Sequence, residues 1–291
     1  MTRTITTDPR ERMIAGLETR ERSLELSGVT TPILEVGEGP PIVALHGPGA
    51  NATHWAEVIP ALSRTHRFVA PDLPGQGQSK LGDAELTGEL VLAWLEELIE
   101  TTCDAPPVLV GVAAGGAIGA RYAADPGRPI EALVLVDALG LREFEPTPEF
   151  GAALNAFVAE PTTRTHELLW RQCALDLDRV RERMGERWDA FEAYNVDRAT
   201  DPGVQAALGA MLNEFVVPAI PAAELDRIAV PTTLIWGRQD RATPVEVAER
   251  ASARHGWQLT VIESCADDPP VEQPEAFVEA LRAAVGNGAG R

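Results

Sequence analysis

Hydrophobic and polar positions along this chain follow two patterns that take turns. One is typical of strands, and the other is the spacing of amphipathic helices. Segments 20–28 and 31–37 alternate apolar and polar residues, as half-buried antiparallel edge strands do. Segment 40–47 is a continuous apolar run, which is typical of a strand covered on both faces. Further strands are predicted at 67–75, 106–112, 131–140, 231–237 and 257–264. Helical spacing recurs between them, so we predict a mostly parallel sheet with helices on both faces.

The strand pattern disappears between residues 143 and 222, and helical spacing takes its place. Four apolar-periodic stretches there are separated by breaks rich in Pro, Gly and Thr. We therefore predict a flexible N-terminal arm (1–15), a core (16–142 and 223–291) and a helical cap (143–222). Most of the aromatic residues in the cap are expected in its core. Three of them are also predicted to bind substrate, namely Trp170, Trp188 and Tyr194.

Composition narrows the possible partners. The chain has 291 residues and a formal net charge of -19, which argues against nucleic acid and anionic membranes as partners. Its three cysteines have no paired spacing, so neither a disulfide framework nor a zinc site is expected. No apolar run approaches about 18 residues, and the first twelve residues lack the apolar stretch of a secretory signal. We expect a cytoplasmic location.

The most informative local pattern is a strand, a tight glycine turn and a helix over residues 106–125. This is the shape of a nucleophile elbow, G-x-S-x-G, with Gly111 and Gly115 as its glycines. The position of the serine holds Ala113. A methyl group cannot attack an acyl carbon, so covalent acyl-enzyme chemistry at this position is excluded.

Five ordered motifs give the chain a family resemblance. They are LHGPG (45–49), APDLPGQGQS (70–79), GVAAG (111–115), LIWGRQDRATP (234–244) and SCADDPPVEQPEAF (264–277). From about residue 20 to 285 the chain resembles the α/β-hydrolase superfamily, in its cap-bearing branch of esterases, epoxide hydrolases and C–C hydrolases. The resemblance implies an α/β-hydrolase fold: an eight-stranded, mostly parallel sheet flanked by helices, with a helical cap insertion.

The resemblance also implies positions for the catalytic groups, and two of the three are changed. Asp240 stands in the acid position, Asp267 stands where the family has its histidine, and Asp137 occupies an alternative acid position. We predict that these three aspartates are catalytic, because carboxyls brought together in a dry pocket can act as general acid and base. Each could instead have a merely structural role, such as capping a loop. Asp268 is expected to face solvent.

The predicted substrate site lies around the elbow and the LHGPG loop. Its expected members are Ala113, Ala114, Gly47, Pro48 and His46. In this fold one oxyanion donor is the N–H of Ala114, and the resemblance places the other at Pro48, which has no N–H. We expect the N–H of Gly49 to be able to replace it after a small shift.

Histidines elsewhere are expected to be structural. His46 is expected to hold its loop through backbone hydrogen bonds, His54 to be an exposed capping residue and His166 to lie at the surface. His54 could alternatively reach the mouth of the pocket, and His166 could act as a base above it. The turn at 75–79 has Gln76 where the family often has histidine.

Three functions remain open from the sequence. The first is an atypical enzyme for a bulky apolar molecule in bacterial natural-product biosynthesis. It would use carboxyl acid/base and proximity catalysis for cyclisation, C–C bond formation, elimination or epoxide opening. The second is a non-catalytic small-molecule binding protein. The third is a serine esterase represented by a variant with alanine in place of its serine. We expect no cofactor, no metal and a small-molecule partner, and a homodimer remains an open alternative.

Overall fold

The fold is built on one eight-stranded sheet. A computed structural model describes residues 8–288. The strand order is β1-β2-β4-β3-β5-β6-β7-β8. The strands are β1 (Arg20–Leu26), β2 (Val29–Val36), β3 (Pro41–Leu45), β4 (Arg67–Pro71), β5 (Val108–Val112), β6 (Ala132–Val136), β7 (Thr232–Gly237) and β8 (Gln258–Ile262). Only the pairings of β1 with β2 and of β2 with β4 are antiparallel. The predicted α/β-hydrolase fold with its mostly parallel sheet is confirmed.

The sequence pattern explains which strands are central. Every residue of β3, β5 and β6 is buried, as their continuous apolar runs predict. The alternating strand β1 has exposed and half-buried positions and lies at the sheet edge. Parallel central strands all end at the same edge, so the loops that follow β3, β5, β6, β7 and β8 meet there.

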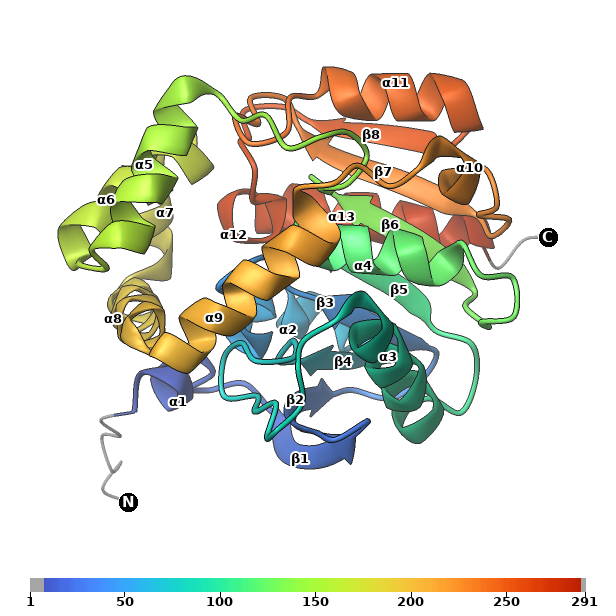
Figure 1. The fold of residues 1–291 in the computed structure, drawn as a ribbon, viewed down its shortest axis with the longest axis horizontal. Coiled ribbons are helices and arrows are strands. Elements are labelled where there is room, and N and C mark those ends of the chain that lie inside the picture. The colour runs from blue at the N-terminus through green and yellow to red at the C-terminus, as the bar shows by residue number, and fades with distance from the viewer. Residues whose placement is uncertain (1–7, 289–291) are drawn as a thin grey trace.

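Helices cover both faces of the sheet (Figure 1). One face packs against α3 (Gly88–Thr102), α4 (Ala114–Ala123), α10 (Ala222–Leu225) and α11 (Glu246–His255). The other packs against η1 (Ala52–Trp55), α2 (Ile59–Leu62) and α13 (Pro274–Gly288). The short helix α12 (Pro269–Glu272) precedes α13. Each face therefore has its own apolar core, and the sheet separates the two.

The insertion between β6 and β7 is helical. Its elements are α5 (Pro148–Ala159), α6 (Thr163–Cys173), α7 (Leu177–Met184), α8 (Glu186–Thr200), α9 (Pro202–Met211) and the π-helical turn η2 (Leu212–Val216). Figure 1 shows α5 to α8 at one side of the sheet, while α9 runs back across it toward α4. This arrangement places α9 and η2 above the carboxyl ends of the central strands.

The N-terminal arm requires a correction. Residues 1–7 lie outside the described part, but residues 8–15 are not a loose arm. They contain α1 (Pro9–Met13), which begins after the N-cap Asp8 and packs against α8 of the cap. Arg10 on this helix is buried and forms ion pairs with Asp72 at 3.1 Å and Glu21 at 2.9 Å. A buried guanidinium needs such partners, and they fix α1 in place.

Candidate active site

The backbone of the nucleophile elbow is present around Ala113. Ala113 follows β5 with φ 49° and ψ -112°, and α4 begins at the next residue. A Cβ atom at Gly111 would collide with the backbone of Gly115, and one at Gly115 would lie 2.5 Å from the carbonyl oxygen of Leu45. Only glycine fits at either position. A left-handed alanine is strained, and it persists because its surroundings fix it.

The methyl group of Ala113 faces an apolar roof. Ala113 is half-buried and packs with the apolar cluster of Ala114, Leu139, Phe144, Leu212 and Val216. Leu139 and Phe144 come from the loop after β6, and the last two come from η2 of the cap. The position of the missing hydroxyl is therefore a water-poor subsite suited to carbon rather than to a charged group.

Asp137 and Asp240 form a buried carboxyl pair beside the elbow. Asp137 directly follows β6 with φ 41°, and its Oδ1 accepts the N–H of Gly237 at 2.9 Å. Asp240 Oδ1 accepts the N–H groups of Ala242 at 2.7 Å and Thr243 at 2.8 Å. The other oxygen of each side chain, Oδ2, is buried without a hydrogen-bond partner, and the two carboxyls lie close enough to affect each other's protonation.

Both members of this pair hold protons more tightly than ordinary aspartates. Burial and the neighbouring Asp240 raise the pKa of Asp137 well above its usual range. Burial likewise raises the pKa of Asp240 to about 7, against the opposing effect of its two backbone donors. Two carboxyls in a dry site cannot both ionise easily, so the pair shares a proton near neutral pH.

Asp267, in the position of the family's histidine, is the third carboxyl of the site. Its backbone N–H donates to the carbonyl of Cys173 at 3.1 Å, and its Oδ1 is buried without a hydrogen-bond partner. Burial and the charge of Asp240 raise the pKa of Asp267 well above its usual range. The predicted meeting of Asp240, Asp267 and Asp137 is thus present in the structure, and Asp267 is the most accessible of the three.

Neither nearby thiol is activated as a replacement nucleophile. Burial and Asp267 raise the pKa of the Cys173 thiol well above its usual range. Burial and Glu272 raise the pKa of Cys265 as well. Both groups stay protonated at neutral pH, whereas the thiolate is the reactive form.

The expected backbone donor at Gly49 is already used, which corrects the prediction that it replaces Pro48. Its N–H donates to Oε1 of Gln76 at 2.7 Å. The N–H of Ala114, at the start of α4, has no acceptor among the hydrogen bonds of the described residues. One backbone donor of the usual two is therefore available for a ligand oxygen.

His46 is fully used by its own loop and offers no ring nitrogen to a substrate. Its Nδ1 contacts the carbonyl of Gly47 at 2.8 Å, and its Nε2 accepts the N–H of Leu73 at 3.0 Å. Burial lowers the pKa of His46 to about 3, so the ring is neutral and donates from Nδ1. Gly47 lies close to the elbow, because a Cβ there would be 3.6 Å from the Cβ of Ala113.

The cap aromatics form a core of their own, which corrects their prediction as a substrate-binding surface. Trp170, Trp188 and Tyr194 are buried together with Phe191. The ring centroids of Trp170 and Trp188 are 5.3 Å apart, and those of Trp170 and Phe191 are 4.9 Å apart. Such edge-to-face packing stabilises the cap itself.

Two histidines and Asp268 differ from expectation. His166 is not at the surface but is buried in the same cap core, where burial lowers its pKa to about 3. His54 is not exposed, and Asp268 does not face solvent. Both are buried, and His54 Nε2 lies 3.2 Å from Asp268 Oδ1. The sequence reasoning missed this histidine–carboxylate contact because the two residues are far apart in the chain.

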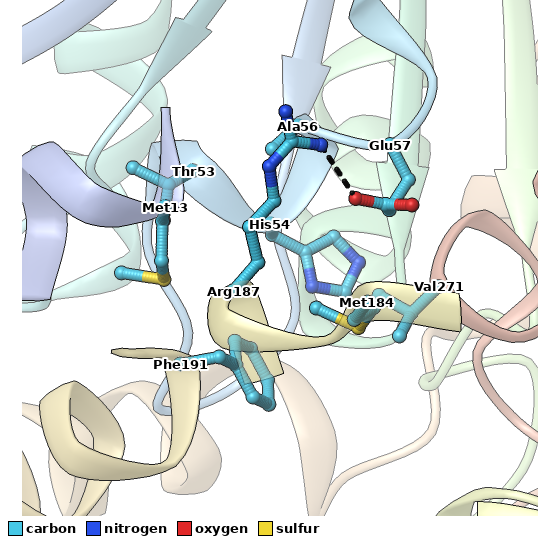
Figure 2. A pocket seen from close by; sticks show the side chains of 9 residues that line it. All are labelled: Met13, Thr53, His54, Ala56, Glu57, Met184, Arg187, Phe191 and Val271. Carbon is cyan, nitrogen blue, oxygen red and sulfur yellow. Dashed lines mark hydrogen bonds and ion pairs between the residues drawn. The ribbon is translucent and has the colours of Figure 1, made fainter. Parts of the chain in front are cut away.

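His54 lies at a small pocket between cap and core, which Figure 2 shows. Met13, Met184, Phe191 and Val271 give it apolar walls, and Arg187 reaches Glu57 at 3.0 Å in the same view. None of the three site carboxyls and no part of the elbow lines this pocket.

No three or more His, Cys, Asp or Glu side chains between residues 8 and 288 are arranged to hold a metal ion. Over the same range no helix is both long and apolar enough to cross a bilayer.

Comparison with known proteins agrees with this geometry. A model of the alpha/beta hydrolase family matches residues 42–280. The 2-hydroxy-6-oxo-2,4-heptadienoate hydrolase of Pseudomonas putida is 30% identical over 270 residues, which are 88% of this chain and 93% of that protein. The magnesium-chelatase 30 kDa subunit of Rhodobacter capsulatus is 32% identical over 232 residues, or 74% of this chain and 76% of that protein.

A solved structure shows the same fold at lower identity. The 2-hydroxy-6-oxo-6-phenylhexa-2,4-dienoate hydrolase of Rhodococcus sp. strain RHA1 superposes with a TM-score of 0.79 at 24% identity. The match covers 92% of this chain and 99% of that structure. With its strand order, its elbow backbone and a family match over most of its length, the chain belongs to the alpha/beta hydrolase family.

Proposed function

We propose that this family member is an enzyme that moves protons on a bulky, apolar, polyketide-like small molecule without forming a covalent intermediate. The observation that carries the proposal is the set of three carboxyls with raised pKa values beside an elbow that holds a methyl group. A serine hydrolase needs a hydroxyl and an imidazole at these positions, and this chain has Ala113 and Asp267 there.

Each carboxyl has a role that follows from its burial. Asp267 is the most accessible, so it takes a proton from substrate carbon or oxygen and returns it. Asp137 and Asp240 are almost fully buried and share a proton, so they keep negative charge near Asp267 and raise its basicity. The apolar roof over Ala113 holds the carbon skeleton of the substrate and limits access of water.

Such proton transfers begin cyclisation, C–C bond formation and elimination. The named substrates of the relatives support a carbonyl-containing ligand, since both hydrolases above are named for oxo-dienoates. The substrate class is therefore an apolar molecule with an acidic C–H next to a carbonyl group.

The experiment follows hydrogen exchange in a minimal ligand of that class. Acetonaphthone, a bicyclic aromatic methyl ketone, is incubated with the protein in deuterium oxide, and the loss of its methyl proton signal is followed by NMR. We expect exchange above the buffer rate with the wild-type protein. We expect Asp267→Asn to slow it by about a hundredfold or more, which is the size of typical general-base contributions.

Asp226→Asn is the matched control, because Asp226 is an exposed aspartate on the C-terminal side of α10 that pairs with Arg254 and His255. It should exchange at the wild-type rate. Equal exchange rates for the wild-type protein and Asp267→Asn would contradict the assigned base.

A non-catalytic binding protein is the second candidate, and one observation favours it. Asp137 and Asp240 are closed off by the protein, and the two nearby thiols, Cys173 and Cys265, have raised pKa values and are not thiolates. In that case acetonaphthone would bind with line broadening or saturation transfer, and its methyl protons would exchange no faster than in buffer.

A further inference from the structure

Gln76 carries a buried hydrogen-bond donor that the protein itself leaves unused. The side chain is fully buried in the turn that follows β4. Its Nε2 has no hydrogen-bond partner in the described part of the chain. A buried amide donor without a partner is destabilising, so its presence needs an explanation.

The orientation of this carboxamide is fixed by its other end. Gly49 N–H can only donate, so the atom that it contacts at 2.7 Å must be the carbonyl oxygen of Gln76. The amide NH₂ group therefore points away from Gly49. An exchange of the oxygen and nitrogen positions would place two donors against each other.

The loop that holds Gln76 in place also touches the elbow. A Cβ at Gly47 would be 3.6 Å from that of Ala113, and Gly115 packs against the carbonyls of Leu45 and His46. The turn is tied to the same loop by the bond from Leu73 N–H to His46 Nε2. The Gln76 turn is thus hydrogen-bonded to the LHGPG loop, and that loop packs against the elbow at Ala113.

We propose that Gln76 Nε2 donates a hydrogen bond to the oxygen of the ligand, and so replaces the backbone donor that Pro48 cannot supply. Together with the N–H of Ala114 it completes a two-donor site for a carbonyl or enolate oxygen. This inference rests on the proposed function, because it assigns the oxygen of the same substrate. Gln76 would then favour ligands that have an oxygen able to accept its hydrogen bond.

The proton-transfer step is balanced with these groups. Asp267 carboxylate takes the proton from the carbon next to the carbonyl, and the C–H bond pair forms the enolate C=C bond. The carbonyl pair moves to oxygen, where the Gln76 and Ala114 N–H groups stabilise the developing charge. Return of the proton to carbon reverses each change.

The test measures the carbonyl of acetonaphthone labelled with carbon-13 at that position. Hydrogen bonding to a carbonyl oxygen moves its carbon signal downfield, so the bound ligand should show a downfield shift with wild-type protein. Gln76→Met has a similar length and no donor, and it should lose this shift and weaken binding by about tenfold. Gln76→Glu keeps an acceptor for Gly49 N–H and should also lose the shift.

Gln78→Met is the matched control, because Gln78 lies two residues away with an exposed side chain. It should keep the wild-type shift and affinity. Gln76→Glu guards against a loop that rearranges in Gln76→Met, since it preserves the contact with Gly49. Circular dichroism and thermal melting establish that each variant is folded.

The inference is overturned if the bound carbonyl signal is unshifted in wild-type protein, or if the shift persists in both Gln76→Met and Gln76→Glu. Failure of the proposed function looks different. In that case the methyl protons of acetonaphthone do not exchange with wild-type protein, while a carbonyl shift that depends on Gln76 is still observed.

Discussion

Two groups of buried acids in this molecule have opposite surroundings. Asp72 is fully buried, and its carboxylate receives Arg10 at 3.1 Å and the N–H groups of Ala52 at 2.7 Å and Gln78 at 2.8 Å. The second group, in the loops that follow β6, β7 and β8, consists of Asp137, Asp240 and Asp267. Its members form no ion pair with Lys, Arg or His in the described ranges.

This difference in surroundings distinguishes a structural acid, Asp72, from acids that can gain and lose protons near neutral pH. A buried carboxylate that has a cation and several donors keeps one protonation state and holds chain segments together. Buried carboxyls that face one another have raised pKa values and exchange protons near neutral pH. In this chain the first kind ties α1 to the core, and we propose that the second kind carries out proton transfer.

The largest expected effect comes from removing the cation of the structural group. Arg10→Met leaves Asp72 as an uncompensated buried charge, and we expect it to lower the free energy of unfolding by roughly 3–5 kcal/mol. Urea denaturation followed by tryptophan fluorescence measures the change. The double variant Arg10→Met/Asp72→Asn should recover part of the loss, because it removes both charges.

Arg12→Met is the control on the same helix. The only hydrogen bond of the Arg12 side chain in the described structure is a 3.4 Å contact with the carbonyl of Glu186, so a change within about 0.5 kcal/mol is expected. A loss for Arg10→Met no larger than that for Arg12→Met would remove the distinction between the two acid groups.

The sequence predicted the sheet well because its signal is local. Continuous apolar runs such as Pro41–Leu45 and Ala132–Val136 report burial on both faces directly. The docking of α1 was missed because most of its residues are polar, and Met13 is its one buried apolar side chain. The pair Asp8–Pro9, an N-cap followed by proline at the first helical position, was a helix signal that was available.

Side-chain placement was harder to predict because it depends on contacts between distant segments. His166 precedes Trp170 by four residues on one helix, so their shared face was a signal of burial in the cap core. The contacts of His54 with Asp268 and of Gly49 with Gln76 join separate segments of the chain. Hydrophobic periodicity acts within one helix or strand and gives no signal for such contacts. Positions of Asp240 and Asp267 followed from the family resemblance, while their raised pKa values depend on burial that only the structure shows.

The next effect in size is the dependence of folding stability on pH. It comes from the group of Asp137, Asp240 and Asp267. The pKa of Asp240 is about 7 in the folded chain and 3.8 in its ordinary state, so the folded form binds this proton more tightly. Its stabilising contribution is complete below pH 3.8 and is lost as the pH rises through 7. Asp137 and Asp267 act in the same direction, whereas nearby Arg142 lowers the pKa of Asp240.

The contribution of the aspartates to the free energy of unfolding is best measured above pH 6.5. His46 and His166 have lowered pKa values, so they change this free energy in the opposite direction only below that pH. Between pH 6.5 and 8 we expect the free energy of unfolding to fall by about 1–3 kcal/mol. Asp240→Asn should flatten this slope and Asp226→Asn should retain it. A slope that is the same in all three proteins would place the titration elsewhere.

The smallest effect is expected from restoring the hydroxyl of the elbow. Ala113→Ser adds one oxygen at a position whose backbone already has the elbow conformation, so stability should change by less than about 0.5 kcal/mol. The new hydroxyl would face the carboxyl of Asp267 in place of an imidazole. We expect neither labelling by a fluorophosphonate nor hydrolysis of nitrophenyl acetate above the wild-type level.

The double variant Ala113→Ser/Asp267→His separates the two missing parts of the triad. It places an imidazole between the new serine and Asp240, and we expect the fluorophosphonate to label it detectably. Labelling of Ala113→Ser alone would mean that Asp267 activates a hydroxyl by itself. The chain would then be an esterase without its serine, and the buried acids would serve nucleophilic attack instead of proton transfer on a bound ligand.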